Sequence, residues 1–68
     1  MYPNLLVVMK RKKITFSQIA ELLHCQLATV SDKAQGKYAN GFYFDEAERI
    51  KNVFFKEFDI EWLFKRED

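Results

Sequence analysis

Apolar residues recur along the chain every three or four positions, which is the spacing of amphipathic helices. No segment alternates apolar and polar residues over the length of a strand, and only two Gly and one Pro interrupt the pattern. The pattern therefore predicts an all-α fold. Its five helices are expected from about Pro3 to Lys12, from Thr15 to near His24, from about Leu27 to Gln35, from about Phe44 to Phe55, and after Asp59.

The expected helix ends carry local signals. Pro3 suits a first helical turn, where its missing N–H has no partner to lose. Thr15 and Gln18 form the Thr-x-x-Gln pattern of a capping box, and Gly36 is a natural C-terminal stop. The tail at residues 65–68 is expected to fray. The side chains expected to be buried share one face of each helix; they are Leu6, Met9, Ile19, Ala20, Leu23, Val30, Ala47, Ile50, Phe54 and Leu63.

Length and composition set the size class and the compartment. A chain of 68 residues cannot build two cores, so residues 1–68 form a single domain. Hydrophobic residues make up 49% and aromatic residues 16%, which argues against disorder. The single cysteine, Cys25, excludes an internal disulfide and fits a reducing compartment; it should be a free, buried and unreactive thiol. With neither a signal peptide nor a stretch long enough for a membrane span, we expect a cytoplasmic protein that is not bound to a membrane.

The overall charge discriminates poorly between partners, but its distribution is uneven. Eleven Lys and Arg against ten Asp and Glu give a formal net charge of +1, which is low for a DNA-binding domain. The run Lys10-Arg11-Lys12-Lys13 concentrates four positive charges, and acidic residues gather after Phe44. The basic run is either a clamp for phosphate or a solvated helix end.

The most informative segment runs from Thr15 to Lys37. Its two expected helices are separated by a turn of about three residues around His24 to Gln26, which is the arrangement of a helix-turn-helix. Ala20 is small where the two helices must cross closely, and Val30 is apolar where the second helix returns to the core. This segment therefore predicts a central helix-turn-helix.

The same residues resemble a known family. Residues 14–23, Thr29-Val30-Ser31 and Gly36-Lys37 look like the lambda-repressor-like, or Cro/C1-type, helix-turn-helix proteins. Residues 1–6 and 44–61 look like small regulators from phages of Gram-positive bacteria, so the resemblance covers nearly the whole chain. It implies a five-helix lambda-repressor-like domain in the cytoplasm of a bacterial host. It also implies a Cro-like transcriptional regulator of a phage or prophage, which binds a double-stranded DNA operator, usually as a homodimer.

The resemblance assigns roles to the second helix of the motif. In such proteins this helix lies in the major groove and its early residues face the bases. The base-facing positions here are Gln26, Leu27, Ala28, Thr29 and Asp32, and at Leu27, Ala28 and Asp32 the family usually carries Gln, Ser, Asn, Lys or Arg. Leu27 and Ala28 can contact only a thymine methyl group, and Asp32 would repel phosphate, although it could accept a hydrogen bond from cytosine.

Two further positions depart from the family, and the remaining polar residues favour the DNA backbone. Phe16 stands where a Gln commonly helps to grip phosphate, and His24 replaces the usual turn Gly. The expected phosphate contacts are Lys33, Lys37, Asn40, Lys12 and Lys13. This inventory supports weak binding of the backbone better than sharp readout of base sequence.

An apolar reading face also suggests a different partner. Phe16, Leu27 and Ala28 could form an exposed patch that binds protein, unless Phe16 folds onto its own core. The alternative function is therefore an anti-repressor-like modulator that binds another phage regulator through a degenerate helix-turn-helix face. Trp62 and Phe64 form either a dimer surface or a cap on the core.

Catalysis and metal binding find no support in the residues. The chain lacks a carboxylate pair, a Gly-rich phosphate loop and a catalytic triad, so we expect no enzyme, no cofactor and no small-molecule substrate. One His and one Cys are too few for a metal site of normal size. His24 and Cys25 flank a tight turn, where adjacent side chains rarely face each other, so a nucleophile–base pair is not expected.

Overall fold

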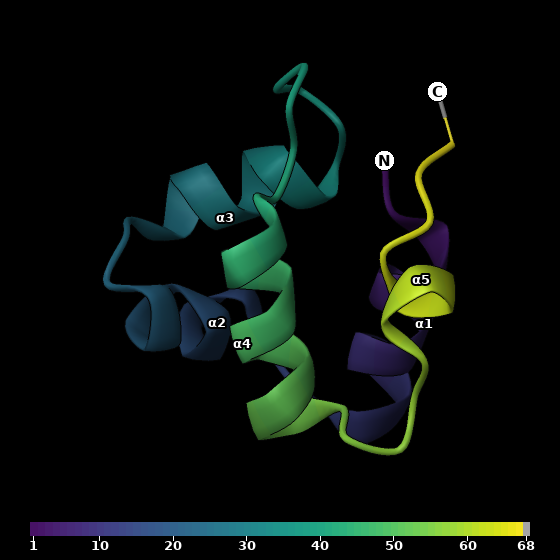
Figure 1. Ribbon diagram of the computed structural model, residues 1–68. Helices are drawn as coiled ribbons and strands as arrows, with labels where there is room; N and C mark the ends of the chain where they lie inside the picture. The colour runs from purple at the N-terminus through teal and green to yellow at the C-terminus, as the bar shows by residue number, and fades with distance from the viewer. Residues whose placement is uncertain (68) are drawn as a thin grey trace.

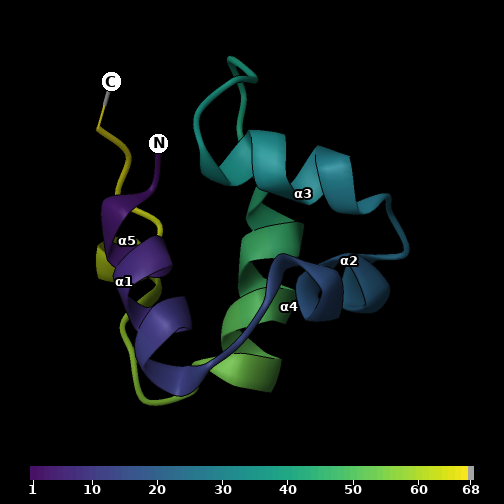
Figure 2. The same cartoon turned by 180° about the vertical axis from the view of Figure 1, so that it is seen from behind.

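The computed structural model describes residues 1–67 and confirms the all-α fold. Its helices are α1 (Pro3–Lys12), α2 (Phe16–Leu23), α3 (Leu27–Ala34), α4 (Phe44–Phe54) and α5 (Ile60–Leu63), and no strand occurs among the described residues. Each helix ends within about a residue of its expected position. Figures 1 and 2 show α2, α3 and α4 gathered on one side of the molecule, with α1 and α5 packed together on the other. None of these helices has the length and apolar character needed to cross a membrane.

The helix ends form through the local contacts that the sequence suggests. The Thr15 hydroxyl accepts a hydrogen bond from the Gln18 N–H at 3.2 Å, and the Gln18 side-chain oxygen accepts one from the Thr15 N–H at 2.7 Å. This reciprocal pair is the predicted capping box. At the start of α5, the Asp59 carboxylate accepts from the Trp62 N–H at 3.1 Å, as expected of an N-cap.

The core confirms seven of the ten predicted buried side chains: Met9, Ile19, Ala20, Val30, Ala47, Ile50 and Leu63. The prediction is wrong for Leu6, Leu23 and Phe54, which are only half-buried and pack against the edge of the core. In α1 the buried residues are Leu5, Val8 and Met9, so Leu5 and Met9 of the expected inward stripe lie in the core and Val8 takes the place expected for Leu6.

Three buried aromatic side chains outside the helices complete the core: Phe55, directly after α4, together with Tyr2 and Phe42. Tyr2 and Phe42 are 3% and 8% exposed, and their rings lie 5.3 Å apart between centroids. The Tyr2 hydroxyl accepts a hydrogen bond from the Phe42 N–H at 2.9 Å, and the Tyr2 N–H donates to the Ala34 carbonyl at 3.1 Å. The start of the chain is thereby fastened to the end of α3 and to the segment that follows it.

The C-terminal segment is ordered against the same region, so the prediction that it frays is wrong for residues 65–67; Asp68 lies outside the described residues. Arg66 donates from Nη1 to the Ala39 carbonyl at 2.6 Å and from Nη2 to the Tyr38 carbonyl at 3.0 Å. Its guanidinium lies 5.4 Å from the centroid of the Tyr2 ring. Glu67 also exchanges backbone hydrogen bonds with the first residue, which brings the two ends of the chain side by side (Figure 1).

Candidate nucleic-acid interface

Helices α2 and α3 are joined by a turn of three residues, His24, Cys25 and Gln26. His24 adopts the left-handed conformation, with φ at 56°. The Cys25 N–H that follows it donates a hydrogen bond to the Ala20 carbonyl at 3.0 Å. In Figures 1 and 2, α2 is seen nearly along its axis while α3 runs across the view, so the two helices cross steeply. With Ala20 and Val30 both buried, this is helix-turn-helix geometry.

The outer side of α3 faces solvent. Val30 and Ala34 form its buried side, while Gln26, Leu27 and Ala28 at its start are exposed. Leu27 exposes 52% of its surface and is one of the large exposed apolar side chains of the molecule. The other two positions expected to face bases, Thr29 and Asp32, are half-buried. The start of α3 is therefore accessible to a partner, although its most prominent side chain is apolar.

A hollow of about 290 Å³ lies beside α3, where the segment at residues 38–43 folds past the helix. It brings together three residues expected at DNA, Thr29, Lys33 and Asn40, with the rings of Tyr38 and Tyr43. The sequence reasoning missed both tyrosines, which are 45% and 56% exposed. The Asn-Gly turn between them, directly after α3, was the signal that could have drawn attention to this segment.

Lys33 is already engaged by an acidic partner. Its ammonium donates to both carboxylate oxygens of Glu46, at 2.9 and 3.1 Å, and lies 4.9 Å from the centroid of the Tyr43 ring. The Lys33 side chain is only 13% exposed. A phosphate contact for Lys33 stays a prediction, and making it would require Lys33 to share its charge with Glu46.

Lys37 is paired more loosely. Its ammonium lies 3.4 Å from a carboxylate oxygen of Asp32, and the Lys37 side chain is 65% exposed. An exposed ion pair of this kind contributes at most about 1 kcal/mol, so a phosphate can displace the carboxylate at little cost. Asn40 is exposed in the turn beyond it. Lys37 and Asn40 are thus the most accessible of the predicted phosphate contacts near α3.

Lys12 and Lys13 lie elsewhere. The end of α1 sits beside the end of α4, at the opposite end of the molecule from α3 in both ribbon views (Figures 1 and 2). There the Lys12 ammonium donates to a Glu57 carboxylate oxygen at 2.7 Å and to the Phe54 carbonyl at 2.9 Å. This hydrogen bond holds the pKa of Glu57 below its ordinary value. The structure therefore does not bring Lys12 and Lys13 together with Lys33, Lys37 and Asn40.

The predicted apolar patch is only partly exposed. Leu27 and Ala28 are exposed, whereas Phe16 is half-buried and packs against the core. Of the two alternatives for Phe16, an exposed patch or packing onto its own core, the structure shows the second. Cys25 is a free thiol, as predicted, but it is half-buried rather than buried, because it sits in the turn between α2 and α3 with one side open to solvent. Its low reactivity stays a prediction.

Other groupings of side chains offer no metal chemistry. Within residues 1–67, no three His, Cys, Asp or Glu side chains are close enough to form a ligand set.

Near the end of the chain, Trp62 is 44% exposed and stacks on Phe58, with the two ring centroids 5.7 Å apart, while Phe64 packs edge-on against Tyr2 and Phe42. Phe64 thus caps the core, and Trp62 remains accessible.

Comparison with known proteins adds no relative: no family model, no curated protein and no solved structure matches this chain.

Proposed function

We propose that this protein is a Cro-like DNA-binding transcriptional regulator of a phage or prophage. The observation that carries the proposal is the surface position of α3, the second helix of a steeply crossed pair, with the residues at its start open to solvent. A helix in that position can enter the major groove, which is wide enough to admit it. The likeness of residues 14–23, 29–31 and 36–37 to lambda-repressor-like proteins supports the same function.

In this proposal the DNA backbone supplies most of the affinity. Lys37 and Asn40 would contact phosphates beside α3, with Lys33 as a further cation shared with Glu46. The Tyr38 hydroxyl lies in the same hollow and can donate to a phosphate oxygen. Because Leu27 and Ala28 offer no hydrogen bond to a base, sequence readout would depend on Gln26 and Thr29. Homodimerisation on a two-fold symmetric operator in the cytoplasm of a bacterial host completes the proposal.

A specific observation favours a second candidate, an anti-repressor-like modulator that binds another phage regulator. Both cations of this region, Lys33 and Lys37, are paired with carboxylates, while Leu27 is exposed at the start of α3. Such a face carries little free positive charge and offers an apolar anchor. These are properties of a surface that docks on protein.

One set of variants separates the two candidates. Binding to DNA from the neighbouring promoter is measured by fluorescence anisotropy over a range of salt concentrations, for the wild type, Lys37→Ala, Leu27→Ala and Lys13→Ala. Lys13 is the comparison, because it is an exposed cation that the sequence predicts at phosphate but that follows α1, away from the α3 surface. If DNA is the partner, Lys37→Ala lowers the log–log salt slope by about 0.9, and Lys13→Ala and Leu27→Ala change it little.

The same proteins are then tested against a candidate repressor from the neighbouring gene. A complex that loses about 2 kcal/mol or more in Leu27→Ala but little in Lys37→Ala would favour the modulator. Absence of DNA binding by the wild type at low salt, together with such a complex, would overturn the regulator proposal. Circular dichroism of each variant checks that it remains helical.

A further inference from the structure

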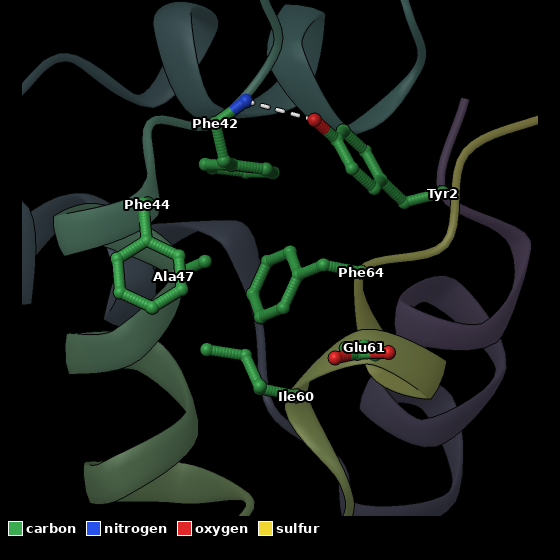
Figure 3. Close-up of a pocket in the computed structure, with 7 residues that line it drawn as sticks. All are labelled: Tyr2, Phe42, Phe44, Ala47, Ile60, Glu61 and Phe64. Atoms are coloured by element: carbon green, nitrogen blue, oxygen red, sulfur yellow. Dashed lines mark hydrogen bonds between the residues drawn. The ribbon is translucent and has the colours of Figure 1, made fainter.

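A second hollow, of about 270 Å³, opens between the first turn of α4 and α5. Figure 3 shows the Phe44 and Phe64 rings on two of its sides, with Phe42 above them and Ile60 below. Glu61 lines it from α5. None of the residues expected to contact DNA belongs to this hollow, so it stands apart from the α3 surface.

One wall of the hollow is an unusually exposed ring. Phe44 exposes 71% of its surface, the highest value among the large exposed apolar side chains. Its neighbours across the hollow, Phe42 and Phe64, are packed edge-on against each other with centroids 5.7 Å apart, so their positions are fixed by the core. The hollow is therefore a preformed aromatic site, and the Phe44 ring that forms one of its walls is accessible to a binding partner.

The charge around the hollow is negative. Glu61 lines it, and Glu48 follows Phe44 by four residues and so lies on the same side of α4. Both side chains are exposed, and the ion pairs of the described residues involve other carboxylates, those of Glu57, Glu46 and Asp32. Over residues 44–68 the sequence has eight acidic and five basic residues. These carboxylates favour the binding of a positively charged group in the hollow.

The size of the hollow points to a single side chain. Pockets for small-molecule ligands usually measure about 300–1,000 Å³, and this one lies at the lower limit of that range and is open on one side. A guanidinium combines the required properties, because its flat face stacks on aromatic rings and its edge pairs with a carboxylate.

The chain itself twice combines a cation, an aromatic ring and a carboxylate. Lys33 lies over the Tyr43 ring with Glu46 as its counter-ion, and Lys12 lies over the Phe55 ring with Glu57 as its counter-ion. We propose that the hollow between α4 and α5 takes an arginine side chain of a partner protein, stacked on Phe44 and Phe64 and paired with Glu61. This site does not depend on the DNA-binding proposal.

The test uses the full chain and a small probe. Nα-acetyl-L-arginine methylamide is titrated into the isotope-labelled protein, and the methyl signals of Ala47 and Ile60, which line the hollow, are followed by NMR. The corresponding citrulline compound is the matched probe, since it has nearly the same shape without the charge. Phe44→Ala and Glu61→Gln remove the stacking wall and the counter-ion, while Glu21→Gln, an exposed acid on α2, is the control for net charge.

The proposal expects saturable shifts of both methyl groups with the arginine probe and binding at least about fivefold weaker with the citrulline probe, which lacks the charge. Glu61→Gln should weaken binding about fivefold, as expected for the loss of one partly exposed ion pair, and Glu21→Gln should leave it unchanged. Phe44→Ala should weaken it to a similar extent, and its exposed position means that the fold survives. Equal binding of the citrulline probe, or no saturable shift with the arginine probe, would each overturn the proposal.

Discussion

Removal of the Tyr2 hydroxyl gives the sharpest test of how the loop beside α3 is held. In Tyr2→Phe the ring keeps its place against Phe42 and Phe64, at centroid distances of 5.3 and 5.9 Å, and only the hydrogen-bond acceptor is lost. The Phe42 N–H, which donates to that hydroxyl at 2.9 Å inside the core, is then left without a partner. An unsatisfied buried donor costs about 1–3 kcal/mol.

The structure places the expected loss in the lower part of that range. Gly41, next to Phe42, packs directly on the Tyr2 hydroxyl, so removing the oxygen frees space into which the segment can relax. We therefore expect Tyr2→Phe to lower the free energy of unfolding by about 1–2 kcal/mol. In a domain of this length each kcal/mol corresponds to a fall in Tm of about 4–8 °C.

The measurement is urea denaturation followed by circular dichroism, with the amide exchange of Phe42 followed by NMR. Tyr38→Phe is the matched control, because the Tyr38 ring is 45% exposed and its hydroxyl makes no hydrogen bond within residues 1–67. The control should stay within about 0.5 kcal/mol of the wild type. If Tyr2→Phe does the same, and the Phe42 amide exchanges equally fast in both proteins, the hydroxyl does not hold this loop and the argument fails.

Three further outcomes follow from single contacts. Gly41→Ala should lower the free energy of unfolding by more than about 1 kcal/mol in urea denaturation, because Gly41 has φ at +59° and a Cβ there would collide with the Tyr2 hydroxyl; wild-type stability would contradict the packing described. His24→Gly should raise the free energy of unfolding by about 1 kcal/mol in the same assay, since glycine adopts the left-handed turn conformation without strain, and an unchanged midpoint would argue against that conformation. Lys12→Met should return the pKa of Glu57 toward its ordinary value in an NMR titration. Since the folded-state pKa is lowered, the stabilisation from this ion pair is present at neutral pH and disappears as the pH falls through the folded pKa. A Glu57 pKa that is equally low in the variant would refute the pairing.

Local chemistry made much of the fold predictable from the sequence. Helix ends depend on contacts within a few residues, such as the Thr15–Gln18 capping box, and on the helical spacing of apolar residues. The turn between α2 and α3 was predicted in the same way, although a histidine rather than a glycine takes its left-handed position. The three misplaced core residues lie at the edges of buried faces, where periodicity cannot decide how far a helix is rotated about its axis.

The sequence by itself thus determined five helices, a helix-turn-helix segment and a set of candidate contacts, because each follows from neighbours along the chain. Only the tertiary structure decided which of those contacts are free. Lys33 meets Glu46 across 13 residues, Lys12 meets Glu57 across 45, and Arg66 reaches the Ala39 carbonyl across 27. A charge counted in the sequence says nothing about such partners, since they become neighbours only when the helices pack. The same packing divided the expected phosphate contacts between two ends of the molecule and created the aromatic hollow between α4 and α5.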